Sequence, residues 1–202
     1  MRRFEQTRGL DSMGSWVWRC GLAVLALLIP CFLVIDAEAE RPEVTETGVK
    51  SAFLYKFTHF AHWPAEVMGK AGAPLSMCVM GRDELADVLE QAIDGRKARN
   101  RPLVVRRVAN ADAARGCHVL FIGWSKLERI ERMLGKLGRQ PTLTVGDAKG
   151  FASRGGMINL TKRGKRMRLE INREAAERVG IRLSSQLLKL ATLVDDTDAG
   201  RE

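Results

Sequence analysis

The chain has 202 residues, a formal net charge of +9 and an apolar fraction of 46%. This composition is that of an ordinary globular protein, and it excludes a fibrous, low-complexity or largely disordered chain. The excess of positive charge raises the possibility of a nucleic-acid partner, but the whole chain has one Tyr and thus lacks the aromatic platforms on which single strands stack. We expect no nucleic-acid partner. The basic clusters are 96–101, Arg106-Arg107 and 162–168.

The N-terminus has the layout of a secretory signal peptide. Arg19 is followed by the uncharged run 21–35 and then by small residues at the −3 and −1 positions of a cleavage site before Glu40. The run is shorter than the roughly 20 apolar residues of a membrane span. We therefore expect cleavage between Ala39 and Glu40 and export from the cytoplasm. An uncleaved N-terminal anchor is the alternative.

Three parts are expected along the chain: a signal peptide at 1–39, one domain at 40–194 and a disordered tail at 195–202. A domain of this size can bury one core and is too short for two independent ones. The charged residues before Met13 are unusual for a signal peptide, which leaves open whether Met1 or Met13 is the true start.

The first half of the domain predicts two helices and two strands. Val49, Ala52, Phe53, Phe57 and Phe60 recur at helical spacing, so 44–63 reads as an amphipathic helix that Pro64 ends. The order that follows is a strand at 75–80, a helix at 83–93 capped by Asp83, a loop at 95–101 and a strand at 103–108.

The second half predicts a central strand, 117–122, because this apolar run is continuous and bounded by glycines. Ser125 and Glu128 form a capping-box pair for a helix ending near Leu137. The remaining expected elements are a strand at 143–145, a glycine-rich loop at 146–156 with Phe151 inserted into the core, a hairpin at 157–171, a short helix capped by Asn172 and a last helix from Ser184 that carries Leu187, Leu188, Ala191 and Val194 on one side. Strands that alternate with helices before a late hairpin predict a three-layer α/β/α sandwich with a central mixed sheet.

Cysteine usage fits an oxidising compartment. Cys20 and Cys31 lie in the predicted signal peptide, so the mature chain keeps two, Cys78 and Cys117, each in an apolar strand-like run. An even count outside the cytoplasm favours a disulfide between them. Two buried free thiols are the alternative. A catalytic pair of Cys117 with His118 is disfavoured, because neighbouring residues of a strand point to opposite faces.

No catalytic constellation is present in the sequence. Asp147 and Glu170 are isolated carboxylates, and no HExxH, GxSxG or SxxK motif occurs. His59 and His62 share a helix face, but two ligands do not make a zinc site. The glycine-rich loop matches no phosphate-binding fingerprint. We expect neither an enzyme nor a metal site or cofactor.

Four stretches, in order and spacing, resemble the YfiR-like family (DUF4154). They are AFLYKFTHFAHWPA at 52–65, CHVLFIG at 117–123, LTVGDAKGFASRGGMINL at 143–160 and LEINREAAERVGIRLSSQLLKLA at 169–191. The resemblance implies an α/β sandwich that dimerises. It also implies a periplasmic protein that binds the sensor domain of an inner-membrane diguanylate cyclase and represses cyclic-di-GMP production and biofilm formation. Cys78 and Cys117 match a cysteine pair of the family, whereas a second pair that some members carry near Phe151 is missing here.

Two hypotheses follow for the function. The first is the cyclase repressor, for which the candidate contact residues are Phe151, Ile158, Glu170 and Arg182, with an apolar centre from the hairpin and the loop and arginines as its rim. The second is a periplasmic domain that binds a small molecule such as an anion, a nucleotide or an amino acid. The same four residues are candidates for its ligand. The domain also occurs fused to sensor kinases, so the partner need not be a cyclase.

Overall fold

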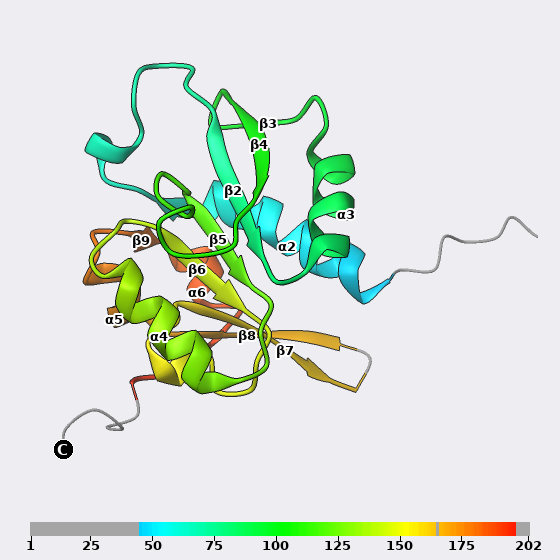
Figure 1. Cartoon of the computed structure of the whole chain (residues 1–202), viewed down its shortest axis with the longest axis vertical. Helices are drawn as coiled ribbons and strands as arrows, with labels where there is room; N and C mark the ends of the chain where they lie inside the picture. The colour runs from blue at the N-terminus through cyan, green and yellow to red at the C-terminus, as the bar shows by residue number, and fades with distance from the viewer. Residues whose placement is uncertain (1–44, 165, 197–202) are drawn as a thin grey trace, which may run out of the picture. The chain divides into compact units, whose positions relative to one another are not determined.

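A computed structural model describes residues 45–164 and 166–196 (Figure 1). The predicted signal peptide and its cleavage site at Ala39 and Glu40 lie outside the described residues, as do 197–202 of the predicted tail. Within the described part of the chain, no helix is long and apolar enough to cross a membrane.

A mixed sheet of eight strands forms the centre of the domain. Its order is β10-β8-β7-β6-β5-β2-β4-β3; the neighbours from β7 to β4 are parallel, and β8 and β3 run antiparallel to β7 and β4. The strands are β2 (Leu75–Met80), β3 (Lys97–Ala98), β4 (Arg101–Arg107), β5 (Val119–Ile122), β6 (Leu143–Gly146), β7 (Ile158–Arg163), β8 (Arg166–Ile171) and β10 (Thr192–Leu193). A second sheet pairs β1 (Ala61–His62) with β9 (Arg182–Leu183).

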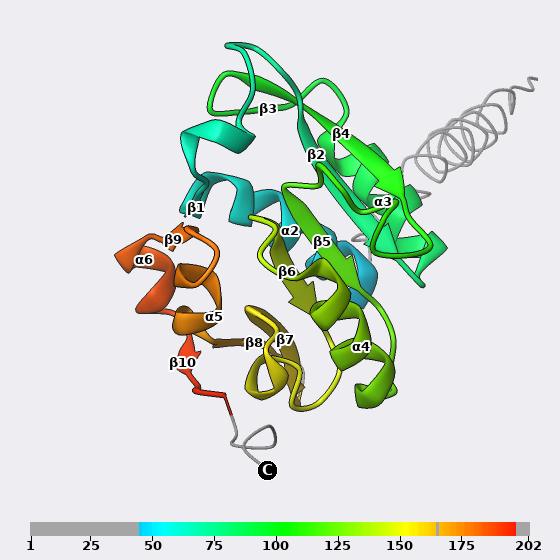
Figure 2. The same cartoon turned by 60° about the vertical axis from the view of Figure 1, so that its left-hand side comes forward.

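Helices cover both faces of the main sheet, which confirms the predicted three layers. Leu54 and Phe57 of α2 and Leu85 and Leu89 of α3 belong to the larger apolar cluster, whereas Ile130 and its neighbours in α4 belong to a second one. Figure 2 shows α4 and α2 on opposite sides of β5 and β6. The helices are α2 (Glu46–Phe60), α3 (Asp83–Ile93), α4 (Leu127–Leu137), α5 (Arg173–Glu177) and α6 (Ser185–Leu188), with single 3₁₀ turns η2 (Ala65–Val67) and η3 (Ala152–Arg154).

The strands β2 and β5 are central, as the continuous apolar runs predicted. In β2, Met77 and Val79 join the cluster under α2 and α3, and Cys78 and Met80 join the one under α4. Side chains of a strand alternate between faces, so a strand that is covered on both sides is apolar throughout. All four residues of β5 are buried for the same reason.

Three boundaries differ from the predictions because tertiary pairing decides them. Residues 95–101, expected as a loop, include β3 and a tight turn at Arg99 and Asn100, which both have positive φ. The first helix ends at Phe60, before the predicted 63, because Ala61 and His62 pair with β9. The last helix ends at Leu188, because residues 192–193 join the sheet as β10.

Helix faces and caps also differ in part. The buried side of α2 consists of Ser51, Leu54, Phe57 and Thr58, whereas Ala52 of the predicted stripe is exposed. The helix α4 begins one residue later than the proposed capping box requires, with Lys126 at its N-cap and no side-chain cap bond. Asp83 is the first helical residue of α3 rather than its cap. The predicted caps at Asn172 and Ser184 are confirmed: they accept hydrogen bonds from the amides of Ala175 and Leu187.

Candidate functional site

A disulfide joins Cys78 of β2 to Cys117, which lies just before β5, and confirms the predicted pairing. The two Cα atoms are 5.9 Å apart, and both residues lie in the cluster under α4, 1% and 3% exposed. The loop 108–117 is tied to the sheet by Arg106, whose guanidinium donates to the carbonyls of Ala113 and Arg115. The disulfide is therefore a buried cross-link between β2 and the segment that leads into β5.

His118 follows the disulfide and has a structural role. Its Nδ1 accepts from the amide of Ser76 at 3.0 Å, and its Nε2 lies 3.2 Å from the carbonyl of Val67. Trp63 donates its indole N–H to the His118 carbonyl and packs edge-on against the ring. Burial lowers the pKa of His118, and the acceptor role of Nδ1 requires the neutral ring. Cys78 and Cys117 are joined in the disulfide, so within 45–164 and 166–196 no free cysteine remains for His118 to activate.

Two of the four predicted contact residues are core residues. Phe151 and Ile158 are both 0% exposed. The Phe151 ring occupies the space beside Gly146 and Gly156, where a Cβ atom on either glycine would overlap it. The glycines of the loop 146–156 thus leave room for the Phe151 ring, and the predicted insertion of Phe151 into the core is confirmed. Neither side chain reaches the surface of the domain, and the contact of Phe151 and Ile158 with a partner or ligand stays a prediction.

The other two predicted residues lie apart. Glu170 is half-buried on β8, where its carboxylate accepts a hydrogen bond from the side-chain amide of Asn159 at 2.9 Å. Arg182 is exposed on β9, paired with His62 in the second sheet. The structure therefore does not gather Phe151, Ile158, Glu170 and Arg182 into one site.

An exposed aliphatic pair that sequence reasoning missed lies near Glu170. Leu190 is 74% exposed and Leu193 54% exposed. Leu193 is part of β10, the edge strand, whose Thr192 is paired with Glu170. The sequence did contain an indication of this surface. In the predicted last helix, Leu190 and Leu193 lie outside the apolar side, so both leucines would be exposed. An edge strand with exposed aliphatic side chains is a surface suited to a protein partner.

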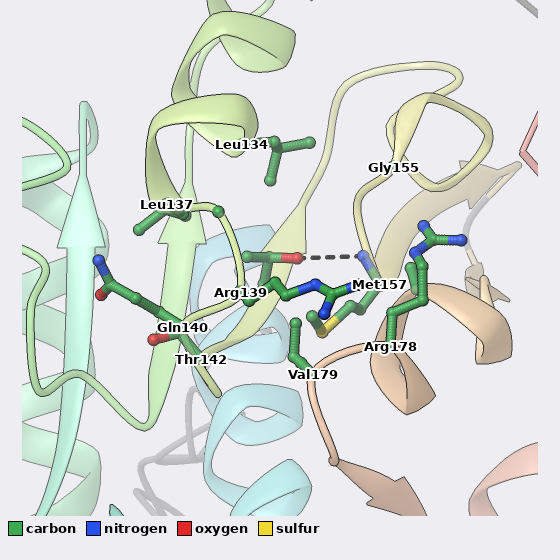
Figure 3. Close-up of a pocket in the computed structure, with 12 residues that line it drawn as sticks. Leu134, Leu137, Arg139, Gln140, Thr142, Gly155, Met157, Arg178 and Val179 are labelled. Carbon is green, nitrogen blue, oxygen red and sulfur yellow. Dashed lines mark hydrogen bonds between the residues drawn. The ribbon is translucent and has the colours of Figure 1, made fainter. Parts of the chain in front are cut away.

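A cavity of about 250 Å³ lies between the end of α4 and α5 (Figure 3). Its apolar lining comes from Leu134, Leu137, Met157 and Val179, among others. The hydroxyls of its two threonines are already used, by the Cys117 carbonyl and the Met157 amide. Arg139 on the α4 side supplies positive charge, whereas Arg178 on the α5 side, also seen in Figure 3, is ion-paired with Asp196 at 2.8 Å. This combination suits a small organic anion.

Charged side chains line a separate crevice at the end of β6. Lys50 of α2 binds both Asp147 and Glu46 at 2.7 Å, and Lys162 binds Glu46 at 3.0 Å. These contacts hold the pKa of Glu46 down at about 2, chiefly through its hydrogen bond with Lys50. Burial lowers the pKa of Lys50, but its bonds to Asp147 and Glu46 outweigh that effect and raise it. Asp147, which looked isolated in the sequence, is an anchor between α2 and the sheet.

No metal centre emerges from the described residues. His59 is exposed on α2, and His62 is exposed on β1. Across 45–164 and 166–196, no three side chains of His, Cys, Asp or Glu come together as a metal site would require.

Comparison with known proteins decides the family. A family model described as YfiR/HmsC-like (DUF4154) matches residues 47–192, which extend from α2 into β10. The chain belongs to the YfiR/HmsC-like family. The family is a periplasmic and regulatory one. The resemblance found in the four sequence stretches is thereby confirmed.

A solved structure supports the fold of this YfiR/HmsC-like domain. The crystal structure of a conserved domain protein from Vibrio cholerae O1 biovar El Tor strain N16961 matches with a TM-score of 0.50 and 16% sequence identity. The match covers 74% of this chain and 60% of that one. At this identity the likeness concerns the fold alone.

Proposed function

We propose that this YfiR/HmsC-like protein binds the periplasmic sensor domain of an inner-membrane diguanylate cyclase and represses cyclic-di-GMP production and biofilm formation. The family match over residues 47–192 is the observation that carries the proposal. A domain without chemistry of its own regulates by binding one state of its partner more tightly than another, and it shifts the partner by the difference in binding free energy.

The edge of the sheet at β10 is the surface that best fits this partner. Leu190 and Leu193 supply exposed apolar side chains, whereas Glu170, which is paired with Thr192, points to the opposite face of the sheet from Leu193. The fully buried centre of an interface between proteins is commonly apolar. The buried Ile158 is paired with Ile171 of β8, which is in turn the partner of Leu193. Arg182, on the second sheet, belongs to a separate surface.

Site-directed cross-linking in the periplasm tests this assignment. A photo-reactive residue at position 193 is compared with one at position 104, because Val104 is also an exposed aliphatic residue but lies toward the opposite edge of the sheet. We expect position 193 to capture a membrane protein with a periplasmic sensor domain and a cytoplasmic cyclase domain, identified by mass spectrometry. Capture of the same protein at both positions, or of soluble proteins only, contradicts the proposed surface.

The homodimer that the resemblance implies is part of the same proposal. Light scattering of the purified domain measures it directly, with a dimer mass expected. A monomer mass over the whole accessible concentration range contradicts it.

Binding of a small organic anion is a second candidate function, favoured by the exposed Arg139 at the cavity between α4 and α5. A ligand at 100 times its Kd raises the free energy of unfolding by about 2.7 kcal/mol, which a thermal-shift screen detects. The variant Arg139→Gln should abolish the shift for a true ligand of this cavity. A ligand whose shift survives this change binds elsewhere.

A further inference from the structure

The β7–β8 hairpin continues beyond the sheet as a two-stranded ribbon. β6 is paired with β7 only at Ile158 and Asn159, and β10 with β8 only at Glu170 and Ile171. Residues 161–163 and 166–168 consequently pair only with one another, and Figure 1 shows this end projecting from the body of the domain. We call the paired residues 161–163 and 166–168 the arginine ribbon.

The two faces of the arginine ribbon differ. On one face, Lys162 binds Glu46 of α2 at 3.0 Å. Residues directly opposite each other in an antiparallel pair lie on the same face. The register pairs Arg163 with Arg166 and Thr161 with Arg168, so three arginines share the other face. All three are exposed.

These arginines lack a counter-charge within the described part of the chain. None of Arg163, Arg166 and Arg168 has a carboxylate at ion-pair distance. Lys162, on the opposite face, is by contrast paired with Glu46. Glu170, the next residue along this face, is bound to Asn159 instead. Like charges that lie directly opposite, as Arg163 and Arg166 do, destabilise a hairpin. An anionic partner would remove this repulsion.

The shape and chemistry of the ribbon restrict that partner. A projecting ribbon cannot enclose a small molecule, which needs a concave site. A protein partner would normally find an apolar centre, and this face offers only Thr161 between its arginines. The sequence 161–168 holds five cations and no acid. Guanidinium groups bind phosphates through paired hydrogen bonds, so a dense and extended array of phosphates satisfies several arginines at once.

We propose that the arginine ribbon docks this domain on an anionic phospholipid bilayer. The binding is electrostatic and superficial, since no apolar side chain on this face would enter the hydrocarbon. It holds the domain at a membrane surface independently of any protein partner. It goes beyond the proposed function, and a vesicle assay that contains no cyclase tests it separately.

Vesicle co-sedimentation measures this binding. Residues 44–202 form a compact unit that contains both apolar clusters and the disulfide, so this unit is tested without the preceding apolar segment. Vesicles of phosphatidylcholine with and without phosphatidylglycerol are compared at low and high salt. We expect binding only when phosphatidylglycerol is present, and weaker binding at high salt, because salt screens exposed charges.

Three variants make the test specific. Each basic side chain near an anionic bilayer contributes roughly a factor of five, so R163Q/R166Q/R168Q should weaken binding about 100-fold. The control R132Q/K136Q/K149Q removes the same charge from exposed positions outside the ribbon and should lose far less. The variant R163K/R166K/R168K keeps the charge and loses only the paired guanidinium hydrogen bonds, so its affinity should lie between those of the wild type and the glutamine variant.

Thermal unfolding of each variant confirms that it is folded, and the glutamine variant should be at least as stable as the wild type because the Arg163–Arg166 repulsion is gone. The proposal is overturned if the wild type ignores phosphatidylglycerol, or if the control loses as much binding as the ribbon variant. If the arginine ribbon binds an acidic protein instead of lipid, the wild type should not respond to phosphatidylglycerol.

Discussion

Removal of the Cys78–Cys117 disulfide should destabilise the domain strongly. The bridge joins residues 39 apart in the sequence, and for a loop of this length the chain-entropy model gives about 4 kcal/mol at 25 °C. For a domain of this size, such a loss lowers Tm by roughly 8–16 °C, at about 2–4 °C for each kcal/mol. Both cysteines are buried in an apolar cluster, so alanine is a compatible replacement at each position.

The assay is urea unfolding of the double variant C78A/C117A beside the oxidised wild type, followed by tryptophan fluorescence. Reduced wild type, prepared by unfolding in a reductant and refolding, separates the lost cross-link from the altered packing. Both samples should lose several kcal/mol. A free energy of unfolding within about 1 kcal/mol of the oxidised protein, for both samples, refutes the role of the bridge as the main constraint on the unfolded chain.

Three other predictions test the packing and polar networks. Gly156→Ala should lower the free energy of unfolding by about 1–3 kcal/mol, because the new Cβ overlaps the Phe151 ring. Gly135→Ala, in open space on α4, should raise it by roughly 0.5–1 kcal/mol, and urea unfolding measures both changes. Burial holds the folded-state pKa of His118 below that of the unfolded chain, so the unfolded state gains the proton first as pH falls below about 6.5. The stability advantage of wild type over His118→Asn should therefore be full above that pH and shrink below it, and an advantage that is constant with pH contradicts this assignment. Asn172→Ala removes the cap of α5 and the bond to the Ala152 carbonyl, and should cost about 2 kcal/mol in the same assay, against little for exposed Arg173→Ala.

Local patterns in the sequence sufficed for the elements whose burial is continuous or regular. The runs at 75–80 and 119–122 are apolar on both sides because helices cover both faces of the sheet there. The Asn172 and Ser184 caps are local hydrogen bonds, so the residue type alone locates them. The disulfide followed from its compartment and the even count of cysteines.

Elements that depend on distant pairing could not be predicted in this way. The turn at Arg99 and Asn100 lacks the glycine that usually marks a tight hairpin, and β3 forms only because β4 lies beside it. The strand β10 replaces the end of a good helical pattern because β8 offers an open edge at Glu170 and Ile171. Leu193 becomes a residue of the sheet edge because residues 192–193 form β10 and do not continue the helix.

The candidate site was only partly predictable for a related reason. Phe151 and Ile158 were predicted as contact residues and lie in the core, because an apolar residue type in a loop or hairpin does not reveal whether its side chain points inward or outward. Arg139 and Arg178 meet at one cavity although they belong to different elements, so their proximity depends on the packing of α4 against the segment after β8. No sequence spacing carries that information.

The most direct test of the regulatory account is the cellular level of cyclic-di-GMP in a strain that lacks this protein, complemented with the wild type, with Leu193→Arg or with Val104→Arg. We predict a raised level in its absence, restored by the wild type and by Val104→Arg but not by Leu193→Arg, with all three proteins present in equal amounts in the periplasm. An unchanged level on deletion contradicts the account.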